Sequence, residues 1–250
     1  MSASYIHYGH REYHPEFVDL NVKSGCPLRS NPPTGLWASR EDAEYGWIDW
    51  CRDQAWPEDD EEFGFGNFIT CFKFKLSDDA NILEIHCEDD ILPYIISRDE
   101  WHLNGLKTGI GDAIDFETIR RLGYDGLELF LSDDYSMHDG VFNSWDCDSI
   151  VIWNLDVIIL SEEKARPEMW KNLDDRTYDA LCNRCNNYDE LFAIVRSVYE
   201  YMRTRKDNYT PERALVYALK ILNQTGQPFQ EDIQEYQKKE ILDKMNSILY

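Results

Sequence analysis

Apolar and polar residues alternate in short runs up to about residue 160, and beyond it they recur at helical spacing. The run over 68–76 alternates in the way that a half-buried strand does. Further short apolar runs predict strands over 81–85, 126–131, 149–153 and 157–160. The pattern therefore divides the chain into a strand-containing domain, 1–160, and a helical appendage, 161–250.

Three helices are predicted between these strands, over about 40–54, 89–101 and 115–122. The third has the clearest ends, because Asp115 can cap its first turn and Gly123 stands just past its last. Strands and helices in this arrangement indicate an α+β domain with mostly antiparallel strands.

The appendage carries helical stripes. Within 188–206 the apolar residues Leu191, Ile194, Val195, Val198 and Met202 recur at steps of three and four. Thr210 can cap a second helix, which extends to about residue 222, and a last helix is predicted over 229–248. These stripes can pack on one another or on the first domain.

The composition is that of a folded chain, with 43% apolar and 14% aromatic residues. No apolar run reaches the roughly 18 residues that a membrane span needs. The N-terminus has neither a basic segment nor a long apolar one, so we expect no secretory signal and predict a cytoplasmic protein without membrane contact. The seven cysteines then read as reduced thiols.

A metal site is not predicted. The closely spaced pair Cys182 and Cys185 is the one CxxC of the chain, and a zinc site would need two further ligands at similar spacing.

The net charge of −23 is uneven along the chain. Residues 1–160 carry 32 acidic against 11 basic side chains, whereas 161–250 carry 16 against 14. An acidic first domain repels a phosphate backbone and disfavours direct nucleic-acid binding. It suits a basic protein partner, or it serves solubility alone.

Three segments in a fixed order carry the candidate chemistry. They are His7-Tyr8-Gly9, then Gly35-Leu36-Trp37-Ala38-Ser39 with Asp49-Trp50-Cys51, and last Asp148-Ser149-Ile150-Val151-Ile152. In this order they resemble the NAD-binding site of ADP-ribosyltransferases of the poly(ADP-ribose) polymerase and diphtheria-toxin type. The resemblance covers roughly residues 5–160 and implies a split antiparallel sheet.

The resemblance also implies a role for each residue, with NAD as the substrate. His7 would bind the ribose, and Gly9 would offer backbone hydrogen bonds to the nicotinamide amide. Trp37 and Trp50 would flank the nicotinamide ring, with Ser39 also in the NAD site. Asp148 would be the catalytic acid, and His7 and Trp37 would complete the catalytic set.

The residues themselves leave two assignments open. Asp146 stands on the same face of the strand as Asp148 if the strand begins there, and Glu128 on another predicted strand is a third candidate acid. The cations nearest the site segments are Arg11, Arg29 and Arg40, and Arg11 is the first candidate for a pyrophosphate contact.

Two functions of different classes follow. The first is an ADP-ribosyltransferase that transfers ADP-ribose from NAD to a macromolecule, most readily a protein, and releases nicotinamide. The second is a non-enzymatic acidic interaction protein, such as a nucleic-acid mimic, that covers a basic partner. The first requires a built site, whereas the second needs only distributed carboxylates.

The charge distribution generates a testable prediction. Binding to duplex DNA should be undetectable at about 0.15 M salt, because residues 1–160 have a net charge of −21. Fluorescence anisotropy of a labelled duplex measures this directly. A sub-micromolar complex at that salt concentration contradicts the prediction.

Overall fold

The computed structural model describes residues 3–20, 34–54, 70–96, 113–143, 145–163, 165–183, 185, 187–204, 209–224 and 235–249. The chain divides into two compact units. The first, which we call the sheet unit, takes the chain up to His7 together with Glu12–Gln54 and Phe72–Lys164. The second, the helical unit, takes Tyr8–Arg11, a segment that ends at Cys71, and the chain from Ala165 onward. Each unit thus draws on separate stretches of the sequence.

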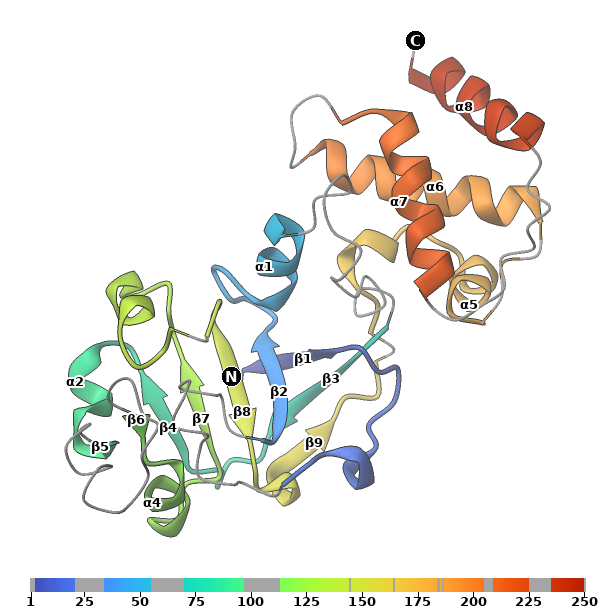
Figure 1. Ribbon diagram of the computed structural model, residues 1–250. Coiled ribbons are helices and arrows are strands. Elements are labelled where there is room, and N and C mark those ends of the chain that lie inside the picture. Colours follow the sequence, from blue (N-terminus) through green and yellow to red (C-terminus); the bar gives the residue numbers. More distant parts are fainter. Residues whose placement is uncertain are drawn as a thin grey trace. The chain divides into compact units, whose positions relative to one another are not determined.

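Seven strands form the main sheet of the sheet unit (Figure 1). They are β1 Ser4–Tyr8, β2 Leu36–Arg40, β3 Cys71–Leu76, β4 Ile82–Ile85, β7 Gly126–Leu129, β8 Ser149–Ile152 and β9 Ile158–Leu160. Their order across the sheet is β4-β7-β8-β2-β1-β3-β9. The β4/β7 pair is parallel, whereas β1/β2, β2/β8, β7/β8 and β3/β9 are antiparallel. The predicted α+β class with mostly antiparallel strands is confirmed.

Two further strands, β5 Ile95–Ile96 and β6 Ala113–Ile114, pair with each other in a separate small sheet. The predicted strand over 68–76 corresponds to β3, and its first two residues lie outside the described residues.

The core of the sheet unit lies on both faces of the main sheet. Along β8, Val151 belongs to one buried cluster, and Ile150 and Ile152 belong to the other. Successive side chains of a strand point to opposite faces, so the two clusters lie on opposite sides of the sheet. We call them the Trp145 cluster and the Phe74 cluster, after a residue in each. Burial on both faces explains why β8 reads as a continuous apolar run.

The first helix of the sheet unit begins later than predicted. The segment predicted as a helix over 40–54 begins inside β2 and contains only α1, Trp47–Gln54. The hydroxyl of Ser39 accepts a hydrogen bond at 2.9 Å from the backbone N–H of Trp47, which satisfies a donor at the start of α1.

The helix predicted over 89–101 is also shorter. It corresponds to α2, Glu88–Ile91, which passes into a 3-10 helix, Leu92–Tyr94. Pro93 explains the change, because proline has no N–H for an α-helical hydrogen bond. Residues 97–101 lie outside the described residues.

The predicted ends of the third helix are confirmed. It is α4, Phe116–Arg121, and the Asp115 carboxylate accepts from the Thr118 N–H at 2.9 Å. Gly123 adopts a φ of 90°, a left-handed conformation that favours glycine just past a helix. Phe116 and Ile119 join the Trp145 cluster.

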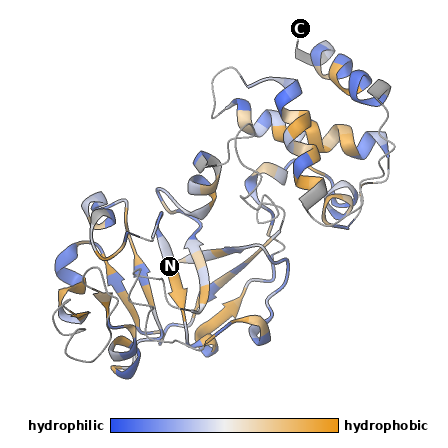
Figure 2. Cartoon of the chain, viewed as in Figure 1, coloured by the Kyte–Doolittle hydropathy of each residue, from blue (hydrophilic) through white to orange (hydrophobic). Residues whose placement is uncertain are grey.

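The helical unit contains α5 Asp175–Asn183, α6 Tyr188–Arg203, α7 Pro211–Gln224 and α8 Glu235–Leu249. The stripe predicted on α6 is buried, and Figure 2 shows hydrophobic residues along both α6 and α7. Helix α5 was not predicted. Among the described helices, none combines the length and apolar character that crossing a membrane requires.

The close packing at Gly126 generates a prediction. A Cβ at this position would lie 2.6 Å from the backbone oxygen of Val151 on β8, so the two strands would have to separate. Gly126→Ala should therefore lower the free energy of unfolding of the sheet unit by about 1–3 kcal/mol, as overpacking typically does. Urea unfolding followed by circular dichroism measures the loss.

Gly140→Ala is the matched control, because the nearest atom to its added Cβ is 3.5 Å away. Equal stability of the two variants would show that β7 and β8 do not approach as closely as described.

Candidate functional site

The three sequence segments that carry the candidate chemistry form adjacent strands. In the sheet β2 lies between β1 and β8 (Figure 1). Ile6 of β1 is opposite Ser39 of β2, and Trp37 of β2 is opposite Val151 of β8. Segments far apart in the sequence are thus brought together side by side.

His7 is joined to β2 by a short hydrogen bond. Its Nδ1 lies 2.6 Å from the backbone oxygen of Trp37. A carbonyl oxygen only accepts, so Nδ1 carries the proton in this contact. The imidazole also packs against the ring of Phe72, with centroids 4.9 Å apart. Phe72 belongs to the Phe74 cluster, which places the His7 ring beside that face of the sheet.

The ring of Trp37 packs on the opposite face. It contacts Trp145 edge-on at a centroid distance of 4.6 Å and packs against the Trp145 cluster. Trp50 lies on α1, where it stacks on Trp47 at 5.0 Å. The structure therefore brings together the backbones of the His7 and Trp37 segments but places the two rings on different faces of the sheet.

Gly9 and Arg11 belong to the helical unit. Gly9 has a φ of 105°, which explains the glycine, and its N–H donates to the backbone oxygen of Thr70 at 2.9 Å. Arg11 pairs with Asp179 at 2.8 Å and lies over the ring of Tyr178. This hydrogen bond uses the Gly9 N–H that the resemblance assigns to NAD, and this ion pair uses the first candidate cation for the pyrophosphate.

Asp148 lies just before β8 and is 7% exposed. Its Oδ1 accepts from the Ser132 N–H at 2.8 Å, and its Oδ2 accepts from the Ser132 hydroxyl at 2.7 Å. The Tyr45 N–H makes a longer contact with Oδ2, at 3.4 Å. Both carboxylate oxygens therefore have a defined partner.

The backbone of Asp148 is held as well. Its N–H donates to the backbone oxygen of Tyr45 at 2.9 Å, and its own backbone oxygen accepts from the Ser39 hydroxyl at 2.9 Å. The same hydroxyl accepts the N–H of Trp47. Ser39 thus connects the start of β8 to the start of α1, which is a structural use of a residue that the resemblance places in the NAD site.

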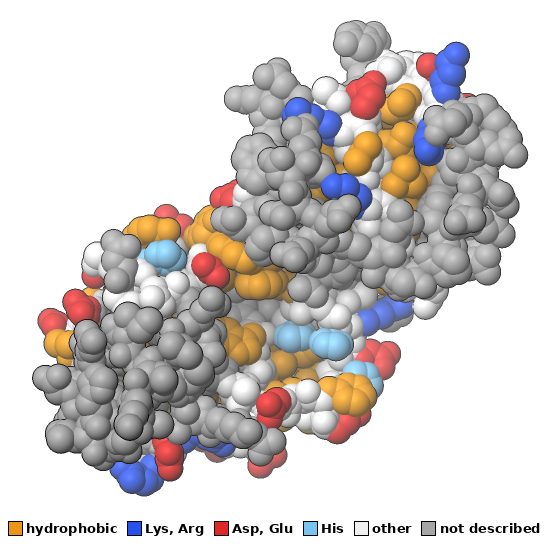
Figure 3. Space-filling view, viewed as in Figure 1, with side chains coloured by type: hydrophobic (Ala, Val, Ile, Leu, Met, Phe, Trp, Pro, Cys, Tyr) orange, Lys and Arg blue, Asp and Glu red, His pale blue; other side chains and the backbone are white. Residues whose placement is uncertain are grey.

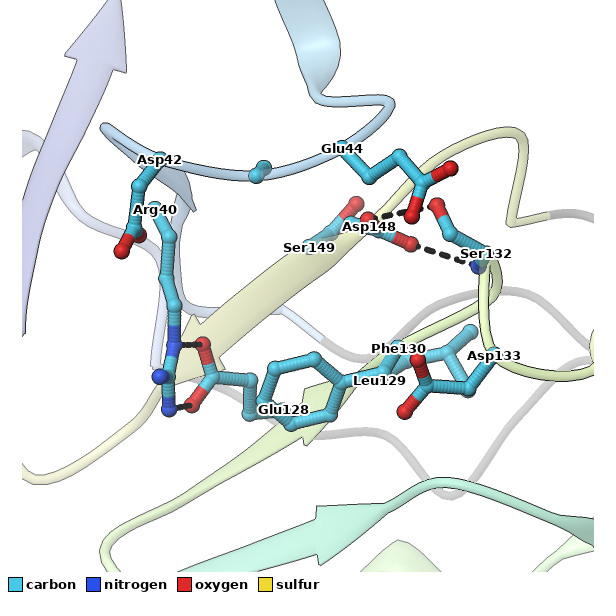
Figure 4. Close-up of a pocket in the computed structure, with 11 residues that line it drawn as sticks. Arg40, Asp42, Glu44, Glu128, Leu129, Phe130, Ser132, Asp133, Asp148 and Ser149 are labelled. Atoms are coloured by element: carbon cyan, nitrogen blue, oxygen red, sulfur yellow. Dashed lines mark hydrogen bonds and ion pairs between the residues drawn. The ribbon is translucent and has the colours of Figure 1, made fainter.

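Asp148 opens onto a pocket of about 210 Å³, which we call the Asp148 pocket (Figure 4). Its lining residues are Arg40, Asp42, Ala43, Glu44, Glu128, Leu129, Phe130, Ser132, Asp133, Asp148 and Ser149. Five of these carry carboxylates and one carries a guanidinium, so the pocket is acidic. Neither His7 nor Trp37 lines it.

Arg40 and Glu128 form a two-pronged ion pair at one side of this pocket (Figure 4). Arg40 Nε and Nη2 donate to the two Glu128 oxygens at 2.6 and 2.8 Å. The Tyr5 hydroxyl donates to Glu128 at 3.0 Å. Hydrogen bonding to Glu128 raises the pKa of Arg40, and burial raises the pKa of Tyr5, so both donors stay protonated at neutral pH.

This pairing bears on two residues that the sequence offers for the site, Glu128 as an acid and Arg40 as a pyrophosphate contact. Glu128 is 3% exposed and holds Arg40, which is a structural role. The Arg40 guanidinium pairs with Glu128 and, at 3.4 Å, with Glu84, so it is a weak candidate for a pyrophosphate contact. The remaining candidate cation, Arg29, lies outside the described residues.

Asp146 and the nearby thiols are placed differently from Asp148. The Asp146 side chain is 40% exposed, and its Oδ1 lies 4.0 Å from His138 Nε2. Burial raises the pKa of Cys147 to about 12 and also raises the pKa of Cys51. Neither thiol forms the thiolate that a cysteine nucleophile needs at neutral pH.

Within the residues that the structure describes, no group of three or more His, Cys, Asp or Glu side chains could hold a metal ion. In the view of Figure 3, the acidic side chains are spread over the sheet unit.

Comparisons with protein-family models, with curated proteins and with solved structures found no match. The family resemblance of the sequence segments therefore stays a prediction.

The Arg40–Glu128 pair generates a stability prediction. Arg40→Leu leaves a carboxylate buried without its cation, which typically costs about 3–5 kcal/mol. The double variant Arg40→Leu/Glu128→Leu should recover much of this loss, because it removes the buried charge as well. Urea unfolding of the wild type and both variants measures the difference.

Arg121→Leu serves as the control, because Arg121 is an exposed residue of α4. Its effect should stay within about 0.5 kcal/mol. A loss of the same small size for Arg40→Leu would mean that Glu128 is not held by this pair.

Proposed function

We propose that the sheet unit is an ADP-ribosyltransferase-like domain that transfers ADP-ribose from NAD to a protein acceptor and releases nicotinamide. One observation carries the proposal. The three segments that resemble the NAD site, around His7, Trp37 and Asp148, form the neighbouring strands β1 and β2 and the start of β8. This adjacency supports the proposal, because residues that share a ligand come from neighbouring elements of the fold.

The chemistry assigns Asp148 its role. The bond between nicotinamide and ribose C1 breaks, and its electron pair leaves with nicotinamide. The ribose then carries positive charge until a nucleophile of the acceptor bonds to C1 and gives up its proton. A fixed carboxylate stabilises this developing charge. Asp148 is fixed in this way, and it opens onto a pocket.

The acidity of the pocket sets the orientation of NAD in this proposal. Asp42, Glu44 and Asp133 line the pocket with Asp148, and carboxylates repel a pyrophosphate. The nicotinamide ring of NAD is positively charged and suits the pocket. The nicotinamide end would therefore point toward Asp148, with the pyrophosphate directed away.

In this proposal His7, Trp37 and Trp50 have smaller roles than the resemblance implies. His7 would hydrogen-bond a ribose hydroxyl, and its Nδ1 contact with the Trp37 carbonyl fixes the ring. Trp37 and Trp50 are both half-buried by neighbouring tryptophans, so only their remaining surface could contact the nicotinamide.

The proposal predicts that Asp148→Ala and Asp148→Asn lower the rate of nicotinamide release about 10²–10³-fold, because each removes the negative charge beside ribose C1. Asp148→Glu should retain activity, since it preserves the charge and matches the residue of the family. Chromatography of released nicotinamide, with transfer of labelled ADP-ribose to protein measured in parallel, gives both rates.

Asp134→Asn is the matched control. Asp134 also accepts an N–H and a hydroxyl from one serine, Ser136, but it lies outside the Asp148 pocket. Its rate should equal that of the wild type. Wild-type rates for Asp148→Ala would point to Asp146 or Glu128 as the acid, and alanine variants of these two residues would then be tested. Full activity in the alanine variants of all three residues would refute the mechanism.

A wild-type protein that neither releases nicotinamide nor transfers ADP-ribose would contradict the proposed function. The acidic interaction protein would then be the better interpretation, since the spread of carboxylates in Figure 3 suits a basic partner.

A further inference from the structure

The residue that holds the Asp148 carboxylate comes from a loop that no motif indicated. Ser132 follows β7, and it donates its N–H to one carboxylate oxygen of Asp148 and its hydroxyl to the other, at 2.8 and 2.7 Å. Figure 4 shows Ser132 directed toward Asp148 from the neighbouring loop. We propose that Ser132 is a positioning residue for Asp148, an inference that rests on the proposed function.

The two Ser132 donors fix the orientation of the Asp148 carboxylate as well as its distance. The terminal torsion of an aspartate is broad, so a carboxylate with a single partner can turn about it. Here each oxygen has its own Ser132 donor, and together the two bonds set the plane of the carboxylate. Without the Ser132 hydroxyl, the partner of Oδ2 would be the Tyr45 N–H at 3.4 Å, which is beyond ordinary hydrogen-bond length.

Ser132 is itself held from both sides. On its N-terminal side, Leu131 is 2% exposed in the Trp145 cluster, and the Phe130 N–H donates to the backbone oxygen of Ile85 at 2.9 Å. On its C-terminal side, Asp133 lies 2.5 Å from His86 Nδ1. The His86 ring also stacks on Phe130, with centroids 4.1 Å apart. The loop therefore presents Ser132 from a fixed backbone.

A purely structural role is the competing explanation, because the same bonds join the loop after β7 to the start of β8. The two roles differ in what they change. A positioning residue lowers kcat and leaves NAD binding unchanged, and its loss adds nothing once Asp148 has been removed. A structural residue lowers the amount of folded protein.

The test measures kcat and KM for nicotinamide release, and the thermal unfolding midpoint, for Ser132→Ala, Ser132→Thr and Asp148→Ala/Ser132→Ala. Ser132→Ala should lower kcat about 10–100-fold, as loss of an orienting partner does, with KM for NAD within about twofold of the wild type. Ser132→Thr keeps a hydroxyl and should restore most of kcat. The double variant should be no slower than Asp148→Ala alone.

Ser136→Ala is the matched control, because Ser136, an exposed residue of the 3-10 helix Tyr135–Asp139, donates its N–H and hydroxyl to the Asp134 carboxylate at 3.1 and 2.6 Å. It should keep the kcat of the wild type.

Every other outcome contradicts either the positioning role of Ser132 or the proposed function. An active wild type whose Ser132→Ala variant keeps kcat overturns the positioning role and leaves the proposed function standing. A double variant slower than Asp148→Ala shows that Ser132 does not act through Asp148. Loss of kcat that follows only loss of folded protein, without rescue by threonine, makes Ser132 structural. A wild type without nicotinamide release overturns the proposed function and this inference together.

Discussion

The ion pair of Arg40 and Glu128 is the constraint that ties together the strands around the Asp148 pocket. It joins the end of β2 to β7 across the start of β8, and the Tyr5 hydroxyl adds β1 to the same group. A buried carboxylate is costly unless its partners are complete, and here the two-pronged guanidinium and the phenol complete them. Because Arg40 and Glu128 neutralise each other, the other carboxylates decide the charge of the Asp148 pocket.

Elements with strong periodicity could be predicted from the sequence. The β8 run around Val151 and the stripe of α6 are buried as expected, because packing of apolar side chains decides both. The failures have local causes. The Ser39 hydroxyl accepts the Trp47 N–H where α1 begins, and Pro93 lacks the N–H that would continue α2. Apolar periodicity shows neither effect. Helix α5 buries only Thr177, Tyr178 and Leu181, which is a weak apolar signal.

The candidate site, too, could be predicted from the sequence only in part. The His7, Trp37 and Asp148 segments, whose order carries the resemblance, are neighbours in the sheet, but neither His7 nor Trp37 lines the Asp148 pocket. The face to which each ring points depends on where each strand begins, which these short motifs do not reveal. Ser132 could not be predicted at all, since its role arises from where the loop after β7 comes to lie beside β8.

The division of the chain between the two units has a consequence for synthesis. Arg11, near the N-terminus, pairs with Asp179, 168 residues later. A ribosome releases Tyr8–Arg11 long before α5 exists, so this segment cannot complete its contacts until the helices of the appendage have emerged. A chain truncated after residue 160 would lack Asp179. Arg11 thus meets its ion-pair partner only once α5 has been synthesised.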